Sequence, residues 1–165
     1  MIKKSNIWME ISDINYKNSI ECLEDLKSKK YICSEWIIDI FTRNIFNYDK
    51  YVYPLKLYRI KLSDFGFNKP TELQQFYKKI EKSDFSLVPP ELALYVRHIY
   101  KDQPAGEWLR FATPMNSLID SDGVPHLPKL GKALGKFFIE TYWSYSKAIF
   151  HPHNEFVLAD KNESS

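Results

Sequence analysis

The first half of the chain carries apolar residues at the spacing of helices. The clearest pattern comprises four residues at positions i, i+3, i+4 and i+7, namely Leu73, Phe76, Tyr77 and Ile80. Thr71 and Gln74 have the spacing of a capping box, so we expect this helix to begin after Thr71 and to pack its apolar stripe on a sheet. Three further helices are predicted: from Ser19 to about Lys29, from Ser34 through Phe41, and from Pro90 to the loop at Asp102.

The second half alternates at the period of strands. In the clearest case, residues 137–143, one face of the predicted strand comprises Phe137, Ile139, Thr141 and Trp143. Further strands are predicted over 51–62, 108–113, 124–130 and 155–159, with a connecting turn over 131–135. Helices followed by a run of strands predict an α+β fold, in which N-terminal helices pack on a C-terminal, mainly antiparallel β sheet.

Length predicts how this fold is divided. A chain of 165 residues has the ordinary size of one domain, so we expect a single α+β domain over residues 1–165. A short leading strand is expected within residues 1–17, around Ile7–Ile11. The polar residues 160–165 are expected to form a frayed tail.

Composition narrows the functional classes. Glycine is scarce, with 5 residues among 165, which disfavours the glycine-rich loops that cradle phosphates and predicts no cofactor. The net charge of +2 lacks the strongly basic balance of nucleic-acid-binding domains, so nucleic acid is not expected as a partner. No run of about 18 apolar residues occurs, so no membrane partner is expected either. Cys22 and Cys33 form no CxxC pair, which favours a reducing, cytoplasmic location.

Three stretches of sequence together form a recognisable pattern. Residues 89–111 read PPELALYVRHIYKDQPAGEWLRF, residues 120–123 read DSDG, and residues 154–159 read NEFVLA. The combination resembles a family of small uncharacterised bacterial α+β proteins with a PPELA helix, a DQPxGEWL loop and strand, and a DSDG turn. The resemblance extends more loosely back to about Leu55. It implies a fold and a bacterial origin, and it assigns no catalytic residue.

Three histidines are the candidates for a metal site. His151 and His153 are two residues apart and would project from one face of a strand. His126 or Glu155 could complete a set of three ligands with an open water position. The alternative is a solvated loop, because Pro152 interrupts regular strand geometry. Structural zinc usually recruits cysteine, and both cysteines lie far away in sequence, so the prediction is that no metal is bound.

The Asp120–Gly123 segment also has two interpretations. Two carboxylates followed by glycine resemble the start of a calcium loop, but the later ligands of such a loop are missing. Asp122 and Gly123 are also an ordinary turn pair, because aspartate bonds to nearby backbone groups and glycine accepts a positive φ. We therefore predict a turn.

The segment from Tyr100 to Arg110 concentrates polar and aromatic side chains in a loop and the start of a strand. Binding sites are often built on such loops, although these side chains could instead satisfy backbone groups and fill the core. We predict a binding surface that combines this loop with the Asp-Gly turn and comprises Gln103, Glu107, Trp108, Arg110, Asp120 and Asp122. No catalytic residue is predicted, because the chain has no G-x-S-x-G motif and no context that activates its cysteines.

Aromatic residues make up 16% of the chain, and tyrosine and tryptophan are enriched at protein interfaces. The sequence therefore favours a non-enzymatic, cytoplasmic binding module that docks on another protein, such as a bacterial accessory or toxin-neutralising (immunity-like) protein. The alternative is a small hydrolase or nuclease that uses His126, His151, His153, Asp120 and Asp122 around a divalent metal. The sequence leaves the oligomeric state open.

Overall fold

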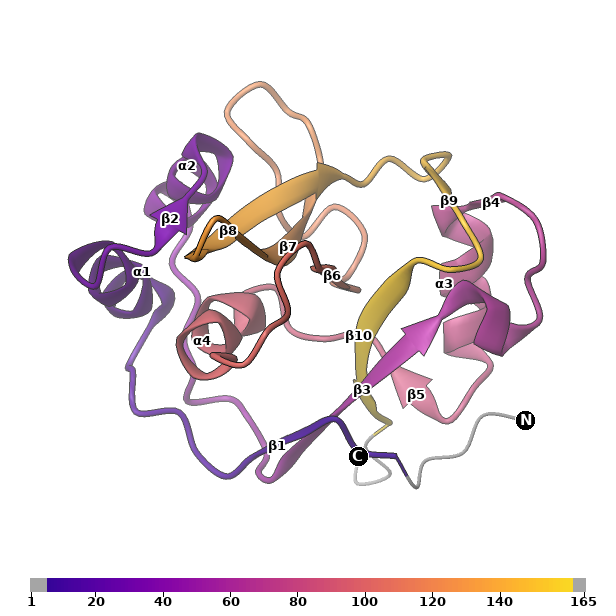
Figure 1. Cartoon of the computed structure of the whole chain (residues 1–165), viewed down its shortest axis with the longest axis horizontal. Helices are drawn as coiled ribbons and strands as arrows, with labels where there is room; N and C mark the ends of the chain where they lie inside the picture. Colours follow the sequence, from indigo (N-terminus) through magenta and orange to yellow (C-terminus); the bar gives the residue numbers. More distant parts are fainter. Residues whose placement is uncertain (1–5, 162–165) are drawn as a thin grey trace.

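The computed structural model describes residues 6–161, with helices distributed along the chain (Figure 1). The helices are α1 (Ser19–Ser28), α2 (Glu35–Arg43), the short 3-10 helix η1 (Leu62–Phe65), α3 (Leu73–Glu81) and α4 (Leu92–Ile99). No helix among these described residues is long and apolar enough to cross a membrane.

A large mixed sheet of eight strands forms the centre of the molecule. Its strands are β1 (Met9–Ile11), β2 (Ile32–Cys33), β3 (Leu55–Lys61), β5 (Phe85–Ser86), β6 (Trp108–Phe111), β7 (His126–Ala133), β8 (Lys136–Trp143) and β10 (Glu155–Asp160). The spatial order is β1-β3-β10-β6-β7-β8-β2, and β5 pairs with β10 outside this path. A second, two-stranded sheet consists of β4 (Thr71–Glu72) and β9 (Ile149–Phe150).

Most neighbouring strands run antiparallel, and β10 with β6 and β2 with β8 are the parallel pairs of the large sheet. The prediction of an α+β fold with a mainly antiparallel sheet is confirmed. Helices and strands are more interspersed than expected, because the short strands β2, β4 and β5, which were not predicted, lie between the helices.

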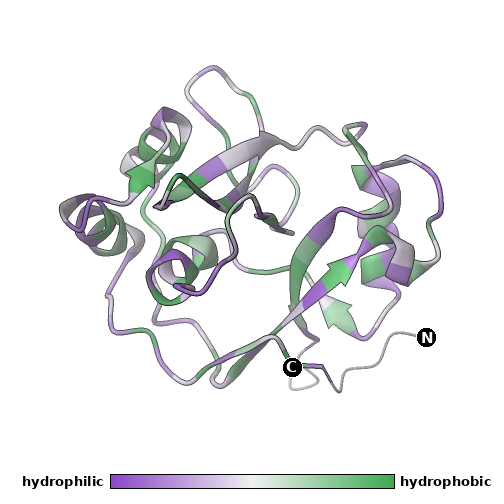
Figure 2. Ribbon diagram, in the orientation of Figure 1, coloured by the Kyte–Doolittle hydropathy of each residue, from purple (hydrophilic) through white to green (hydrophobic). Residues whose placement is uncertain are grey.

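Apolar side chains fill both faces of the sheet. Helices α1, α2 and α4 cover one face, where Leu23, Ile40 and Val96 pack in the same core as strand residues such as Leu130. Helix α3 covers part of the other face, over β3 and β10 (Figure 1). The helices show hydrophobic residues beside hydrophilic ones in Figure 2, as expected for helices with one buried side.

The apolar stripe of α3 is confirmed, while its predicted cap is wrong by one residue. Leu73, Phe76 and Ile80 are buried against the sheet. The N-cap is Glu72, whose backbone N–H donates to the Gln75 side chain at 3.3 Å. The predicted cap, Thr71, instead belongs to β4.

Other boundaries differ for local reasons. Asn18 caps α1, because its side-chain oxygen accepts the Glu21 N–H at 3.1 Å, whereas the predicted cap Ser19 lies inside the helix and is buried. Ser34 caps α2 as expected, accepting the Ile37 N–H at 3.3 Å. Helix α4 begins at Leu92, after the two prolines.

The strand boundaries differ more. Strand β7 continues to Ala133, so the predicted five-residue turn is wrong, and Leu134 and Gly135 alone connect β7 to β8. Both have positive φ, at 52° and 73°, as two-residue hairpin turns require. The leading strand is the shorter β1. Asp160 belongs to β10, so the tail was predicted to begin too early, and residues 1–5 and 162–165 lie outside the described part of the chain.

Replacing Phe76 with alanine is expected to lower the free energy of unfolding by about 3–5 kcal/mol, through lost burial and the cavity left behind. The ring is 1% exposed, and its centroid lies 5.0 Å from that of Phe156. Urea denaturation would measure the change. Lys79→Ala, on the exposed side of the same helix, is the control, and a loss below about 0.5 kcal/mol for Phe76→Ala would contradict the burial.

Candidate functional site

Gln103, the first predicted site residue, lies inside the protein. It is 1% exposed, and its side-chain nitrogen donates to the Leu130 carbonyl at 3.0 Å. Its oxygen accepts a hydrogen bond from Arg97 at 2.8 Å. The Gln103 side chain thus links the loop before β6 to the buried guanidinium of α4.

Glu107, directly before β6, belongs to a partly buried ionic network with residues of β3 and β10. One carboxylate oxygen lies 2.5 Å from Arg59 Nη2, and the other accepts the Tyr100 hydroxyl at 2.7 Å. Arg59 also forms a bidentate pair with Glu155, at 3.0 Å and 2.7 Å. The Trp8 ring lies on this guanidinium at 5.7 Å. These contacts engage both carboxylate oxygens of Glu107 within the fold.

Trp108 and Arg110 lie on the sheet face that α3 leaves partly uncovered. The Trp108 ring covers Gly131, where a Cβ atom would lie only 2.3 Å from the ring. Arg110 lies 5.3 Å from the ring centroid of Tyr142, and burial lowers the pKa of its guanidinium. Both residues are half-buried, so they form part of the accessible surface of this sheet face.

Asp120 organises the turn to which it belongs. One of its oxygens accepts the backbone N–H groups of Asp122 and Val124 at 2.8 Å and 2.9 Å. The other oxygen lies 2.8 Å from His126 Nε2. These hydrogen bonds lower the pKa of Asp120, and the one with His126 has the largest effect. The predicted turn is thereby observed, and the side chain of Asp122 is exposed.

His126, the first residue of β7, also contacts β8, because its Nδ1 lies 2.8 Å from the Thr141 hydroxyl. A carboxylate, an imidazole and a hydroxyl in this order can activate a nucleophile. The His126 side chain, however, is 0% exposed, and a general acid must contact the leaving group of its substrate. The arrangement therefore ties the turn to β8.

The other two histidines stack on each other, with ring centroids 5.8 Å apart. His151 and His153 are exposed and lie between β9 and β10. Among residues 6–161, no group of three or more histidine, cysteine, aspartate or glutamate side chains is placed to hold a metal ion.

The outer side of strand β8 is only partly covered. Strand β2 pairs with it in parallel at Phe138 and Ile139, and the Ser34 N–H donates to the Ile139 carbonyl at 3.0 Å. The chain then turns into α2, which begins at Glu35. In the described part of the chain, no strand pairs with this side of β8 beyond Ile139.

The strand geometry determines which backbone groups face this free edge. In an antiparallel ladder, the N–H and C=O groups of alternate residues point toward the paired strand and away from it. Ile139 directs its carbonyl away from β7, toward Ser34. Thr141 and Trp143 have the same parity, so their backbone groups also point outward.

A cleft of about 560 Å³ lies at this free edge, between the start of α2 and the segment that leads to β9. We call it the β8-edge cleft, and it is lined by Trp36, Lys129, Glu140, Thr141, Tyr142, Trp143, Tyr145, Ala148 and Ile149. It contains all four residues of β8 beyond the pairing with β2. The cleft therefore occupies the place that a longer β2 would fill.

Exposed apolar side chains gather at this cleft. The exposed fractions are 41% for Trp36, 59% for Trp143, 48% for Tyr145 and 47% for Ile149. Ten large apolar side chains are exposed among the described residues, so four of the ten line this one cleft. Single exposed apolar residues are ordinary, whereas a cluster rimmed by polar groups marks an interaction site.

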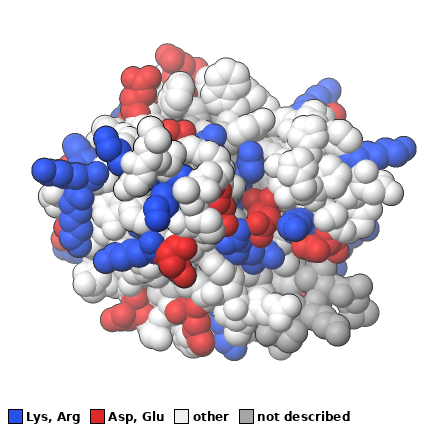
Figure 3. All heavy atoms as spheres, in the orientation of Figure 1, with Lys and Arg blue, Asp and Glu red and all other residues white. Residues whose placement is uncertain are grey.

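The charged residues of the cleft come as a pair of opposite sign. Lys129 and Glu140 are directly opposite each other on β7 and β8. Burial lowers the pKa of Lys129, although the Glu140 carboxylate opposes this shift. Basic and acidic groups are also interspersed on the face shown in Figure 3. Neither observation indicates a strongly anionic or cationic ligand.

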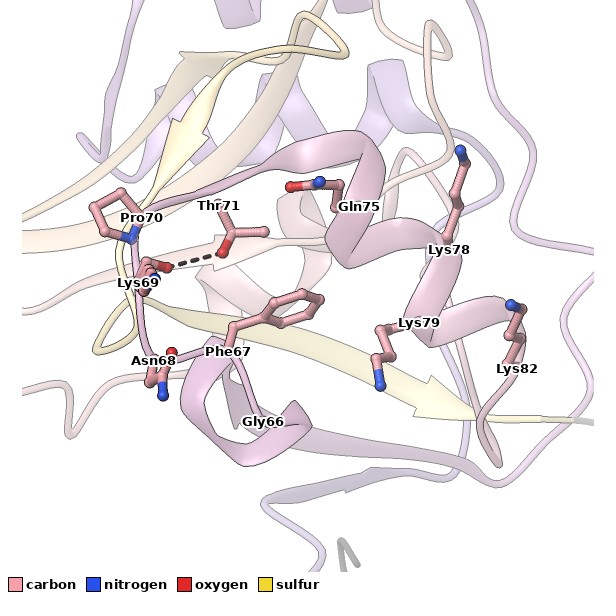
Figure 4. Close-up of a pocket in the computed structure, with 10 residues that line it drawn as sticks. All are labelled: Gly66, Phe67, Asn68, Lys69, Pro70, Thr71, Gln75, Lys78, Lys79 and Lys82. Atoms are coloured by element: carbon pink, nitrogen blue, oxygen red, sulfur yellow. Dashed lines mark hydrogen bonds between the residues drawn. The ribbon is translucent and has the colours of Figure 1, made fainter.

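A larger, more basic cavity of about 650 Å³ lies beside α3 (Figure 4). Four lysines line it, namely Lys69, Lys78, Lys79 and Lys82, and all four are exposed. Three of them follow the last turns of α3, where cations stabilise the negative end of a helix. The same helix end disfavours an anion, so this cavity is the weaker candidate for a binding site.

The main walls of the β8-edge cleft were not predicted as a site. Trp36 lies within the helix expected from Ser34 through Phe41, and Trp143 belongs to the expected strand face. The aromatic sequence Trp143-Ser144-Tyr145 at the end of that strand is the signal that could have identified the cleft. No family model, curated protein or solved structure matches the chain, so the resemblance to a bacterial family stays a prediction.

Proposed function

We propose that this protein is a binding module that docks on another protein through the β8-edge cleft. The observation that carries the proposal is the gathering of Trp36, Trp143, Tyr145 and Ile149 at one cleft. Tryptophan and tyrosine supply much of the binding energy at protein interfaces, because they bury large areas at a small cost in side-chain entropy. A bacterial accessory or toxin-neutralising protein would act in this way.

The metal-dependent hydrolase has less support. Asp120 and His126 hydrogen-bond to each other and to groups of the fold, so their ligating atoms are already engaged. The binding surface centred on Gln103 and Glu107 is also less favoured, because these two side chains bind Arg97 and Arg59. Cys22 and Cys33 are free thiols, which supports a cytoplasmic location.

Affinity capture from cells of the source organism tests this function. The immobilised wild-type chain is expected to retain a specific protein that the double variant Trp36→Ala/Trp143→Ala loses, with a drop in affinity of about tenfold or more. Both side chains are exposed, so the variant should keep its melting temperature within a few degrees.

The matched control is Leu134→Ala. Leu134 is 97% exposed at the β7–β8 turn and does not line the cleft. This variant should retain the same protein as the wild type. Equal retention by the double variant, or equal loss in the control, would place the docking surface elsewhere.

A further inference from the structure

The β8-edge cleft combines an apolar wall with unpaired strand backbone. Side chains such as Trp143 can bind many kinds of partner. The outward N–H and C=O groups of Thr141 and Trp143 are more selective, because they alternate at the spacing of a strand edge. Another extended backbone is the group that offers matching donors and acceptors at that spacing.

We propose that the partner docks by adding one of its own extended segments to β8 as a further strand of the sheet. This inference rests on the proposed function and specifies its mode of recognition. The segment would continue the line of β2 beyond Ile139, where the cleft provides the space. Main-chain hydrogen bonds would supply affinity, and side-chain contacts would supply selectivity.

The two faces of β8 define the chemistry of the segment. Thr141 and Trp143 share the face of Ile139, on the same side of the sheet as Trp36 of α2. Glu140 projects from the opposite face, beside Lys129. The segment is therefore expected to alternate, with apolar residues toward the two tryptophans and polar residues toward the charged pair.

A second copy of this chain is a poorer occupant. An antiparallel β8–β8 pair centred on Tyr142 would place Ile139 opposite residue 145 of the other copy. Strand β2 occupies the outer side of Ile139 in both copies, so the β2 of each copy would meet the end of the other copy's β8. A foreign segment pairs with the same short edge, but it brings no second β2 that must be accommodated.

Peptide selection tests this inference without knowledge of the natural partner. The probe is a phage library of random peptides of about ten residues, the upper length of ordinary strands. It is selected on the immobilised full chain and counter-selected on Trp36→Ala/Trp143→Ala, with Leu134→Ala as the control that must still bind. The best peptide is then synthesised with each backbone nitrogen methylated in turn, and affinities are measured by fluorescence anisotropy.

The expected result is a period of two. Methylation of the two nitrogens, two residues apart, that would pair with the Thr141 and Trp143 carbonyls should weaken binding by about tenfold, while methylation of the nitrogen between them should have little effect. Peptides that need both tryptophans but show no alternation would overturn strand addition and leave the cleft as a docking site. Failure to obtain any cleft-dependent peptide would overturn strand addition too. Self-association of the wild type that the double variant abolishes would do the same, with a second copy as the occupant.

Discussion

Arg97→Met is expected to lower the free energy of unfolding by about 3–5 kcal/mol, one of the two largest effects on stability that we expect of a single substitution. Arg97 is 0% exposed on α4 and has no carboxylate partner among the described residues. Its guanidinium donates instead to four oxygens, at 2.6–3.1 Å, which belong to Tyr100, Gln103, Gly131 and Phe138.

The physical reason is that methionine fills much of the same space but donates no hydrogen bond. Four buried acceptors would lose a donor, and those that keep no other partner would each cost about 1–3 kcal/mol, less any relief from removing a buried charge. Burial lowers the pKa of Arg97 to about 10, which still leaves the side chain charged at neutral pH. The wild-type fold therefore holds a cation whose charge is stabilised by carbonyl dipoles.

Arg97→Lys separates charge from geometry. Lysine keeps the charge, but its single ammonium group cannot reach all four acceptors that the planar guanidinium contacts. The free energy of unfolding of this variant should therefore also fall by more than about 2 kcal/mol. Urea denaturation monitored by fluorescence would measure both variants. Stability of Arg97→Met within about 0.5 kcal/mol of the wild type would show that these hydrogen bonds contribute little.

Arg59→Met is expected to cost about 2–4 kcal/mol, because it leaves two neighbouring carboxylates without their common cation. Arg59 lies 2.5 Å from Glu107 and 2.7 Å from Glu155, and its side chain is 20% exposed. The partial exposure lowers the expected loss below that of a fully buried pair.

Repulsion between the two carboxylates gives this variant its own signature. Glu107→Gln in the Arg59→Met background should recover part of the lost stability, although the same change in the wild type should destabilise the protein. Urea denaturation of the four proteins would measure this coupling, and additive losses would contradict the network.

The longer elements of the fold could be predicted because their patterns are local. Helix α3 and strand β8 each repeat apolar residues at a clear period, and both occur within one residue of the expected start. Strands β2, β4, β5 and β9 have two residues each, so they are too short to show any period. Their existence depends on partners distant in sequence, such as Phe150 beside Thr71.

The site was harder to predict, because the binding surface was inferred from the concentration of polar residues along one stretch of the sequence. Gln103 and Glu107 have the residue types of a binding loop, yet Arg97 and Arg59, which pair with them, come from α4 and β3. Nothing in the local pattern reveals those partners. The free edge of β8 is likewise a product of topology, because it exists only where β2 ends and α2 turns away.

The most direct test of the β8-edge cleft is amide hydrogen exchange on the full chain, with and without the captured partner. We expect slower exchange at Thr141 and Trp143, and little change in the Gln103–Arg110 loop or at the lysines beside α3. Protection of the loop or the lysine-lined cavity, with residues 140–145 unchanged, would contradict the assignment of the β8-edge cleft as the docking site.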